Sequence, residues 1–310
     1  MKKKFKILIA TDYSEAAKNA AIYAVQFAKS INADLMIMHT YDVPELSTPA
    51  EVMNGTEYRI ELEESELSEL EYQRKRLFES LNFSADEPAC ECFVTAGEAG
   101  AEISKAAKNH GVDLIIAGTH GATGFREIFS GSNTAYLIKK SEVPVLAIPV
   151  GAEFSSINQI VFATEEREGE LPAISFVIDF ARKFNAAVTI LHISEQVRTE
   201  PTEEQALNKF ITELKSKILY DKLNAHLIYN TNVIEGINDF CAEKKADWLV
   251  MSPQKVSLLQ KIFTPSSGTT RKMSFHTVVP LFSVPDQYVS GSEKVKELSD
   301  VDEEYLSDEF

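Results

Sequence analysis

The feature that most constrains this fold is an internal repeat of two strand-like segments. KILIATD at Lys6–Asp12 is repeated as QIVFATE at Gln159–Glu165. ADLMIMH at Ala33–His39 is repeated as AAVTILH at Ala186–His192 with the same offset in sequence number. A chain of 310 residues has room for two domains of ordinary size. The repeat therefore predicts two domains of one fold.

Extended and helical patterns alternate through the first copy. Short apolar runs predict strands, and apolar residues spaced three or four apart predict amphipathic helices. The predicted strands are Phe5–Ala10, Leu35–His39, Ala89–Val94, Asp113–Ala117 and Val145–Ile148. The predicted helices are Ser14–Ile31, Glu57–Leu81, Glu98–His110 and one that begins near Ser132. Such alternation is typical of an α/β protein, a parallel sheet with helices on both faces.

The last two strand-like segments of each copy also correspond. ADWLVMS at Ala246–Ser252 matches VDLIIAG at Val112–Gly118, at a smaller offset. PLFSVP at Pro280–Pro285 then matches PVLAIP at Pro144–Pro149. The second copy therefore has fewer residues than the first between the segments equivalent to Ala33–His39 and Val112–Gly118. We expect domains at 1–150 and 151–285, joined near Val150–Ile157, and an acidic tail at 286–310.

Charge and composition disfavour several classes of protein. The formal net charge is −16, and the tail holds nine acidic residues against two lysines. Nucleic-acid binding requires a basic face, which this balance disfavours. No apolar run approaches the roughly 20 residues that span a bilayer, and the apolar run after the basic start is too short for a signal peptide. We expect a cytoplasmic protein with neither a nucleic-acid nor a membrane partner.

The cysteines offer little chemistry. Cys90, Cys92 and Cys241 form neither a disulfide framework nor a metal-ligand spacing. Cys90 and Cys92 alternate on one strand face, and we interpret them as packing residues rather than as a redox pair. Since no His/Asp/Glu cluster has metal-ligand spacing either, we expect no metal ligands in the protein itself.

A glycine-rich stretch separates two of the predicted strands. It begins with Gly118 and Gly121 and ends with Gly131 and Ser132 at the start of a helical pattern. Glycines let the backbone adopt positive φ and approach a ligand closely. Free N–H groups at a helix start and in such a loop bind anionic oxygens. The arrangement favours a phosphate site, although a glycine-rich connection without a ligand has the same local pattern.

The glycine spacing is not that of the common nucleotide loops, since G-x-x-x-x-G-K-[ST] and G-x-G-x-x-G are both absent. It reads Gly118-x-x-Gly121, nine residues, Gly131-Ser132, followed by Asn-Thr-Ala-Tyr-Leu-Ile-Lys-Lys-Ser and Pro-Val. This pattern resembles the ATP-binding universal stress protein family. The resemblance covers residues 1 to about 285, clearly in the first copy and loosely in the second.

The resemblance implies two tandem Rossmann-like (adenine nucleotide alpha hydrolase-like) domains, each a five-stranded parallel sheet flanked by helices. Single-domain members of the family dimerise through their last strand. Here the corresponding strands, Val145–Ile148 and Leu281–Val284, lie on one chain. Exposed apolar edges invite pairing, and a short linker raises the effective concentration of one edge for the other. We expect an intramolecular pseudo-dimer with antiparallel final strands. Whether two such chains also form a homodimer is left open by the sequence.

The resemblance also implies a nucleotide site in the first domain. Asp12 would meet the nucleoside, Thr40 would read adenine through its backbone, and the glycine stretch would hold the phosphates. The residues implied are Ala10, Thr11, Asp12, Thr40, Ala117, Gly118, His120, Gly121, Gly131, Ser132, Asn133 and Thr134. Mg²⁺ would arrive with ATP, held mostly by phosphates and water.

Three of these interpretations have alternatives. Asp12 also suits the N-cap of the following helix, with Glu15 completing a capping box. His120 either donates a hydrogen bond or a proton to a phosphate, or contacts it through backbone only. His39 and His192 end equivalent strands, and we interpret both as packed histidines rather than as functional residues.

The second copy has lost the glycine pattern. Ser252, Lys255 and Pro265 stand where the first copy has its three motif glycines, and Glu165 stands where it has Asp12. Side chains there hinder close backbone approach, and proline removes an N–H donor. We therefore expect one ATP site per chain and a structural or regulatory second domain.

The expected function is an ATP-binding module of stress or energy-state response that acts on an unknown protein partner. Two alternatives stay open at this point, a slow ATPase or autophosphorylating enzyme, and a nucleotide-free interaction scaffold. No catalytic base for water attack stands out in the sequence, so weak hydrolysis is the most that the enzyme alternative predicts.

Overall fold

Ten strands lie side by side among the residues that the computed structural model describes, which are 4–43, 55–83, 88–119, 133–165, 168–195, 202–252, 279–285 and 288. The strands of the first half are β1 (Lys6–Thr11), β2 (Asp34–Tyr41), β3 (Cys90–Ala96), β4 (Leu114–Thr119) and β5 (Val145–Pro149). Those of the second half are β6 (Gln159–Ala163), β7 (Ala187–Ser194), β8 (Leu223–Tyr229), β9 (Trp248–Met251) and β10 (Leu281–Ser283).

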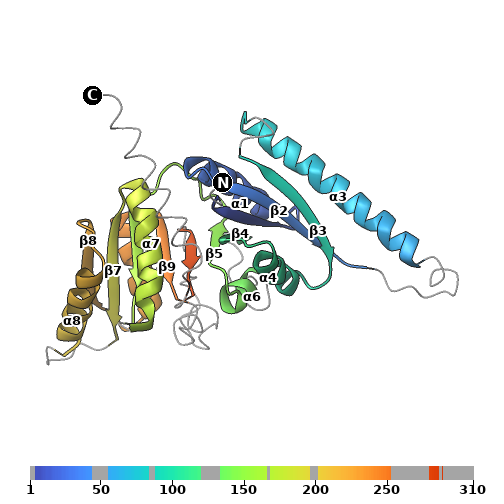
Figure 1. Ribbon diagram of the computed structural model, residues 1–310. Coiled ribbons are helices and arrows are strands. Elements are labelled where there is room, and N and C mark those ends of the chain that lie inside the picture. The colour runs from blue at the N-terminus through green and yellow to red at the C-terminus, as the bar shows by residue number, and fades with distance from the viewer. Residues whose placement is uncertain are drawn as a thin grey trace, which may run out of the picture.

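The strands form one sheet in the order β3-β2-β1-β4-β5-β10-β9-β6-β7-β8 (Figure 1). Neighbouring strands are parallel within each half, and β5 and β10 are antiparallel where the halves meet. The predicted α/β class is confirmed, with five parallel strands in each half joined into one ten-stranded sheet. The domain limits at 150 and 285 stay predictions.

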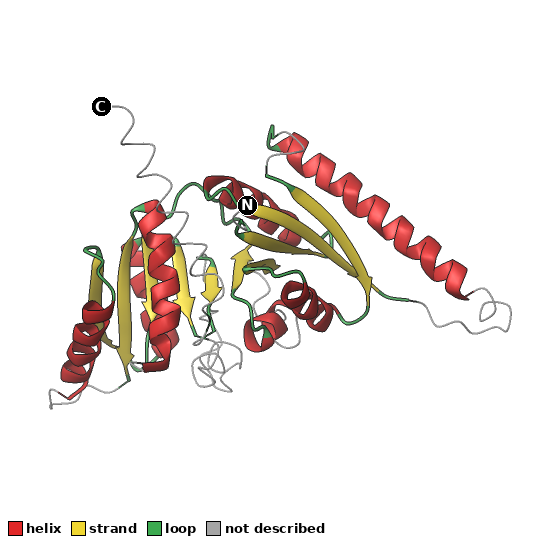
Figure 2. Cartoon of the chain, in the orientation of Figure 1, coloured by secondary structure: helices red, strands yellow, loops and turns green. Residues whose placement is uncertain are grey.

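Helices cover both faces of the sheet (Figure 2). One face carries α1 (Glu15–Ser30), α3 (Gly55–Ser80), α7 (Leu171–Phe184) and α8 (Thr202–Lys217). The other carries α4 (Ala99–Asn109), α6 (Asn133–Lys140) and α9 (Val233–Lys244). Alternation along a strand explains the two layers, since Ile7 and Ile9 of β1 face α1 whereas Leu8 and Ala10 face α4 and α6. Among the described helices, none combines the length and apolar character needed to cross a membrane.

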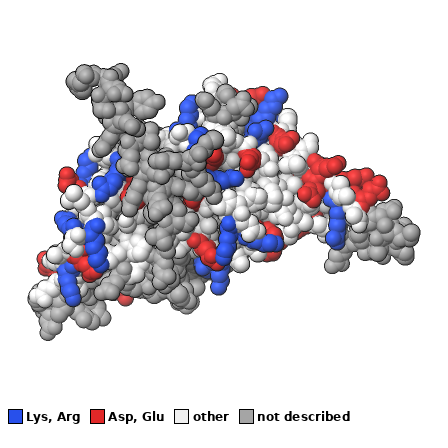
Figure 3. Space-filling view, viewed as in Figure 1, with Lys and Arg blue, Asp and Glu red and all other residues white. Residues whose placement is uncertain are grey.

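The predicted elements of the first copy are all present, and their ends differ by one or two residues from those expected. Acidic side chains gather at the outer end of α3, whose first turn carries Glu57 (Figure 3). Most of the first turns of α3 are exposed, whereas Leu70 and Phe78 further along are buried against the sheet. The long acidic helix therefore packs through its second half.

The internal repeat seen in the sequence is reproduced in the strand register. Ile7 of β1 pairs with Leu35 of β2, and Ile160 of β6 pairs with Val188 of β7. These are the residues that the sequence repeat makes equivalent. The two halves therefore use the same hydrogen-bonding frame, although their loops differ in length.

The two halves join through the seam, which we define as Val145–Pro149 of β5 paired with Leu281–Ser283 of β10. At its centre Leu146 pairs with Phe282, which occupies the equivalent position in the second half. Ala147 pairs with Leu281 on one side and Val145 with Ser283 on the other. This reciprocal pattern is that of a twofold interface. The predicted antiparallel pairing of the final strands is confirmed.

Aromatic rings cross the seam on the α1 and α7 face. The cluster consists of Phe27, Phe180, Trp248 and Phe282, with centroids 5.2–6.1 Å apart for the contacting pairs. Trp248 Nε1 also donates a buried hydrogen bond of 2.8 Å to the hydroxyl of Tyr23 on α1. Burial raises the pKa of Tyr23, so this hydroxyl stays protonated. The two halves therefore share a specific core rather than a simple contact.

The chain beyond β10 returns to this core. Tyr288 is buried, and its ring packs edge-on against Phe176 with centroids 5.2 Å apart. Its hydroxyl donates to the carbonyl of Asp113 in the first half, at 3.0 Å. The packed part of the chain therefore extends past the expected start of the acidic tail. The other tail residues, including Asp286 and Ser290–Phe310, lie outside the described residues.

A charge at the seam should destabilise the whole chain. Leu146→Asp places an unpaired carboxylate in a fully buried position, which should cost about 3–5 kcal/mol of unfolding free energy. Denaturant titration followed by circular dichroism measures this loss. Val150→Asp is the control, because Val150 follows the same strand and is 44% exposed. Equal stabilities of the two variants would contradict the seam.

Removal of the Tyr288 side chain should also destabilise the fold. Tyr288→Ala empties a buried aromatic position and leaves the Asp113 carbonyl without this donor, a loss of roughly 3 kcal/mol. Thermal unfolding measures it as a decrease in Tm. Tyr229→Ala, at an exposed position at the end of β8, should change Tm little. If both variants melt like the parent, Tyr288 does not bind the core in solution.

Candidate functional site

The candidate site lies at the carboxyl ends of the first-half strands, where α/β sheets bind ligands. Ala10 on β1 and Ala117 on β4 are register neighbours, and both are small and buried. Thr11, at the end of β1, is in register with His39 on β2. The carboxyl ends of β1, β2 and β4 thus lie at one edge of the sheet.

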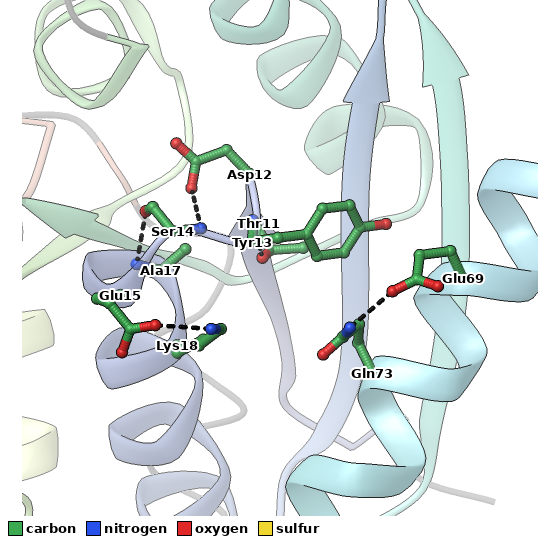
Figure 4. Close-up of polar contacts among 9 residues, drawn as sticks. All are labelled: Thr11, Asp12, Tyr13, Ser14, Glu15, Ala17, Lys18, Glu69 and Gln73. Carbon is green, nitrogen blue, oxygen red and sulfur yellow. Dashed lines mark hydrogen bonds and ion pairs between the residues drawn. The ribbon is translucent and has the colours of Figure 1, made fainter.

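A tight turn, Thr11–Ser14, links β1 to α1 (Figure 4). Thr11 Oγ1 accepts from the N–H of Tyr13 at 3.1 Å, and Asp12 Oδ1 accepts from the N–H of Ser14 at 3.0 Å. Ser14 Oγ accepts from the N–H of Ala17 at 3.2 Å and is the N-cap of α1. The alternative that Asp12 caps this helix is therefore wrong, because Asp12 lies two residues before the cap.

Asp12 has one carboxylate oxygen that accepts no hydrogen bond from a described residue. The residue is exposed, and its Oδ1 is held by the Ser14 N–H. Its Oδ2 makes no hydrogen bond to any described residue and is directed away from α1 (Figure 4). A carboxylate oxygen accepts hydrogen bonds only, so it suits a hydroxyl or amine donor. The turn thus presents an oriented acceptor at the edge of the sheet.

Gly118 is required for packing, whatever its role toward a ligand. A Cβ at this position would lie 2.4 Å from the carbonyl oxygen of Ala16 and 2.8 Å from the N of Ala17, in the first turn of α1. Thr134, near the start of α6, donates from Oγ1 to the Gly118 carbonyl at 3.0 Å. The end of β4 is thereby fixed to the starts of both helices, and the exposed Asn133 begins α6 beside it.

The remaining predicted residues divide into two groups. Thr40 is half-buried on β2 and is in register with Thr95 of β3. His120, Gly121, Gly131 and Ser132 lie outside the described residues. The structure therefore brings together the predicted residues on β1, β4 and α6, with Thr40 one strand further out.

His39 is a residue whose contact sequence reasoning missed. Its Nδ1 lies 2.8 Å from the carbonyl oxygen of Thr11, and its ring packs on Tyr13. The interpretation as a packed histidine was incomplete, because the ring also holds the turn. Its place at the end of the predicted strand, immediately before Thr40, was the available signal.

The equivalent turn of the second half is organised differently. The fully buried Glu170 accepts hydrogen bonds from the Thr164 hydroxyl and from the N–H of Glu165. A short 3-10 helix, η1 (Glu168–Glu170), precedes α7 here. Ser252, which replaces Gly118, is buried. A carboxylate of the protein itself thus lies at this turn, whereas Lys255 and Pro265 lie outside the described residues.

The thiols are packed. Burial raises the pKa of Cys90 to about 12, that of Cys92 to about 11 and that of Cys241 to about 12. A thiol with such a pKa holds little thiolate at neutral pH and reacts slowly. These values support the interpretation of Cys90 and Cys92 as packing residues. In the part of the chain that the structure describes, no group of three or more His, Cys, Asp or Glu could hold a metal.

A methyl group at Gly118 should disrupt the site and the fold together. Gly118→Ala forces β4 away from α1, an overpacking that should cost about 2–3 kcal/mol, measured by denaturant titration. Gly151→Ala is the control, since its Cβ meets nothing within 4 Å and the variant bears only the strain of φ +84°. A Gly118→Ala variant as stable as the parent would contradict the close approach.

Comparison with known proteins gives the family. The universal stress protein family model matches residues 5–149. A universal stress protein of Methanocaldococcus jannaschii is 31% identical over 152 residues, covering 46% of this chain and 93% of that protein. One of Bacillus subtilis is 31% identical over 149 residues, covering 46% of this chain and 97% of its own.

A solved structure extends the likeness to both halves. The crystal structure of a universal stress protein from Archaeoglobus fulgidus superposes with a TM-score of 0.64. It covers 91% of this chain and 98% of its own, at 18% identity, and so shows a shared fold. The sequence relatives each match about half of this chain, whereas this fold spans the two halves. The chain belongs to the universal stress protein family.

Proposed function

We propose that the first half binds one adenine nucleotide, ATP, and that the chain is a nucleotide-dependent module of stress or energy-state response. The observation that carries the proposal is the exposed Asp12 carboxylate, held by one oxygen and open at the other. It lies at the carboxyl edge of the sheet, next to the strand that leads into the G-x-x-G, nine residues, G-[ST] motif.

Each part of the site has a physical role in this proposal. Asp12 Oδ2 accepts a hydrogen bond from a ribose hydroxyl, and the backbone of Thr40 contacts adenine. The residues Gly118–Gly131 surround the phosphates, and the start of α6 at Asn133 and Thr134 directs N–H donors at them. Mg²⁺ accompanies the phosphates, coordinated chiefly by phosphate oxygens and water.

The second half is proposed to bind no nucleotide. Glu170 brings a buried carboxyl group to the turn equivalent to that of Asp12, where it accepts hydrogen bonds from the Thr164 hydroxyl and the Glu165 N–H. The motif glycine Gly118 is replaced there by the buried Ser252. One nucleotide per chain follows. The second half then contributes packing and a surface for a protein partner, and the proposed setting is the cytoplasm.

The stoichiometry and the role of Asp12 can be tested together by calorimetry with Mg·ATP. The parent should bind one ATP per chain. Asp12→Asn keeps an oxygen for the Ser14 N–H but replaces the free oxygen by an amide. Loss of a hydrogen bond to a charged acceptor should weaken the binding free energy by about 1.5–3 kcal/mol, so Kd should rise roughly 10- to 100-fold. Glu165→Gln, the matched change in the second half, should leave Kd unchanged.

Three other outcomes would contradict the proposal. Two equivalent ATP sites per chain would show that the second half binds as well. Absence of nucleotide, both in the calorimeter and in the purified protein by mass spectrometry, would favour the interaction scaffold. Sustained phosphate release at saturating ATP would favour the ATPase alternative over a binding module.

A further inference from the structure

The His39 side chain connects β2 to the end of β1 at the candidate site. It lies on β2 in register with Thr11 on β1, and it immediately precedes Thr40. Its side chain is 13% exposed, so the ring lies largely inside the protein at the edge where the site is proposed.

The direction of the hydrogen bond to Thr11 follows from the chemistry of the two groups. A carbonyl oxygen only accepts, so His39 Nδ1 must carry the proton in the 2.8 Å contact. The Thr11 carbonyl is therefore already bound by the protein. Thr11 Oγ1 is likewise bound, by the N–H of Tyr13. In this turn the Tyr13 hydroxyl also lacks a partner among the described residues but is buried, whereas Asp12 Oδ2 is an acceptor on an exposed residue.

The same ring supports the strained part of the turn. Tyr13 has φ +64°, a left-handed conformation that is unfavourable for a bulky side chain. Its ring lies over that of His39 with centroids 4.4 Å apart and planes tilted by 32°. Burial, with Glu66 and Glu69 nearby, raises the pKa of Tyr13 to about 12, so this side chain stays neutral. The His39 ring thus packs on a residue whose backbone conformation is unfavourable.

The opposite edge of the His39 ring faces α3. Its Nε2 lies 3.7 Å from Oε2 of Glu66, whose side chain is 27% exposed. The His39 ring thus has three neighbours. The Thr11 carbonyl lies at Nδ1, the Glu66 carboxylate lies at Nε2, and the Tyr13 ring packs on its face. These contacts come from the Thr11–Ser14 turn and from α3, and together they engage both ring nitrogens and one face of the imidazole.

We infer that His39 is a positioning residue of the nucleotide site, which fixes the Thr11 carbonyl and through it the direction of the Asp12 carboxylate. The inference rests on the proposed function for its ligand and on the described contacts for its geometry. His39 itself does not touch the nucleotide. It acts on affinity by keeping the Thr11–Ser14 turn in the conformation that presents Asp12 Oδ2.

Calorimetry with Mg·ATP tests the inference through three variants. His39→Leu fills the position with an apolar side chain but removes the donor, and Kd should rise about five- to tenfold. His39→Asn places an amide N–H near the position of Nδ1 and should restore most of the affinity. His192→Leu, at the equivalent position of β7, should leave Kd unchanged. Equal Kd for His39→Leu and the parent would overturn the inference.

A second measurement does not depend on the ligand. Nitrogen-15 spectra of the imidazole should show Nδ1 of His39 protonated, and the amide hydrogens of Tyr13 and Ser14 should exchange faster in His39→Leu than in His192→Leu. An unprotonated Nδ1, or unchanged exchange, would overturn the positioning role. If the parent binds no ATP while these signatures are present, the proposed function fails and the contacts of His39 stand.

Discussion

The antiparallel pairing of β5 with β10 is the contact on which the rest of the structure depends. Each half alone would end in an apolar strand with unpaired N–H and C=O groups, an edge that invites association. The seam closes both edges at once, because Leu146 and Phe282 occupy equivalent positions and face each other. The buried clusters on the two sheet faces then run through both halves without interruption.

Helix α1 connects this seam to the candidate site. Its start is capped by Ser14 beside Asp12, and its far part carries Tyr23 and Phe27 to Trp248. Midway, Asn19 Nδ2 donates to the carbonyls of Pro149 and Ala152, both at 3.1 Å, and so fixes the chain that leaves β5. The turn that presents Asp12 is therefore attached to a helix held by both halves.

The two halves share the strand register of the sheet but differ in the turns that follow β1 and β6. Strand register does not depend on the residues that follow each strand, so one copy can lose its site while the sheet is preserved. In the first half the Thr11 hydroxyl accepts from the N–H of Tyr13, and Asp12 Oδ1 accepts from the N–H of Ser14. The turn thus presents the other carboxylate oxygen of Asp12. In the second half Glu170 binds the corresponding turn from inside.

The sequence alone determined the number of copies, the alternation of strands and helices, and the strands that meet at the seam. These follow from periodicity, spacing and apolar edges, which are properties of local segments and of their repetition. It also indicated Asp12 and the glycine motif, through a resemblance rather than through geometry.

The tertiary structure decided that Ser14 rather than Asp12 caps α1, that Gly118 is required by Ala16, and that Tyr288 returns to the core. It also decided that His39 holds the Thr11 carbonyl. Each of these depends on the direction of a side chain toward a residue it meets only after folding, and local spacing does not encode that direction.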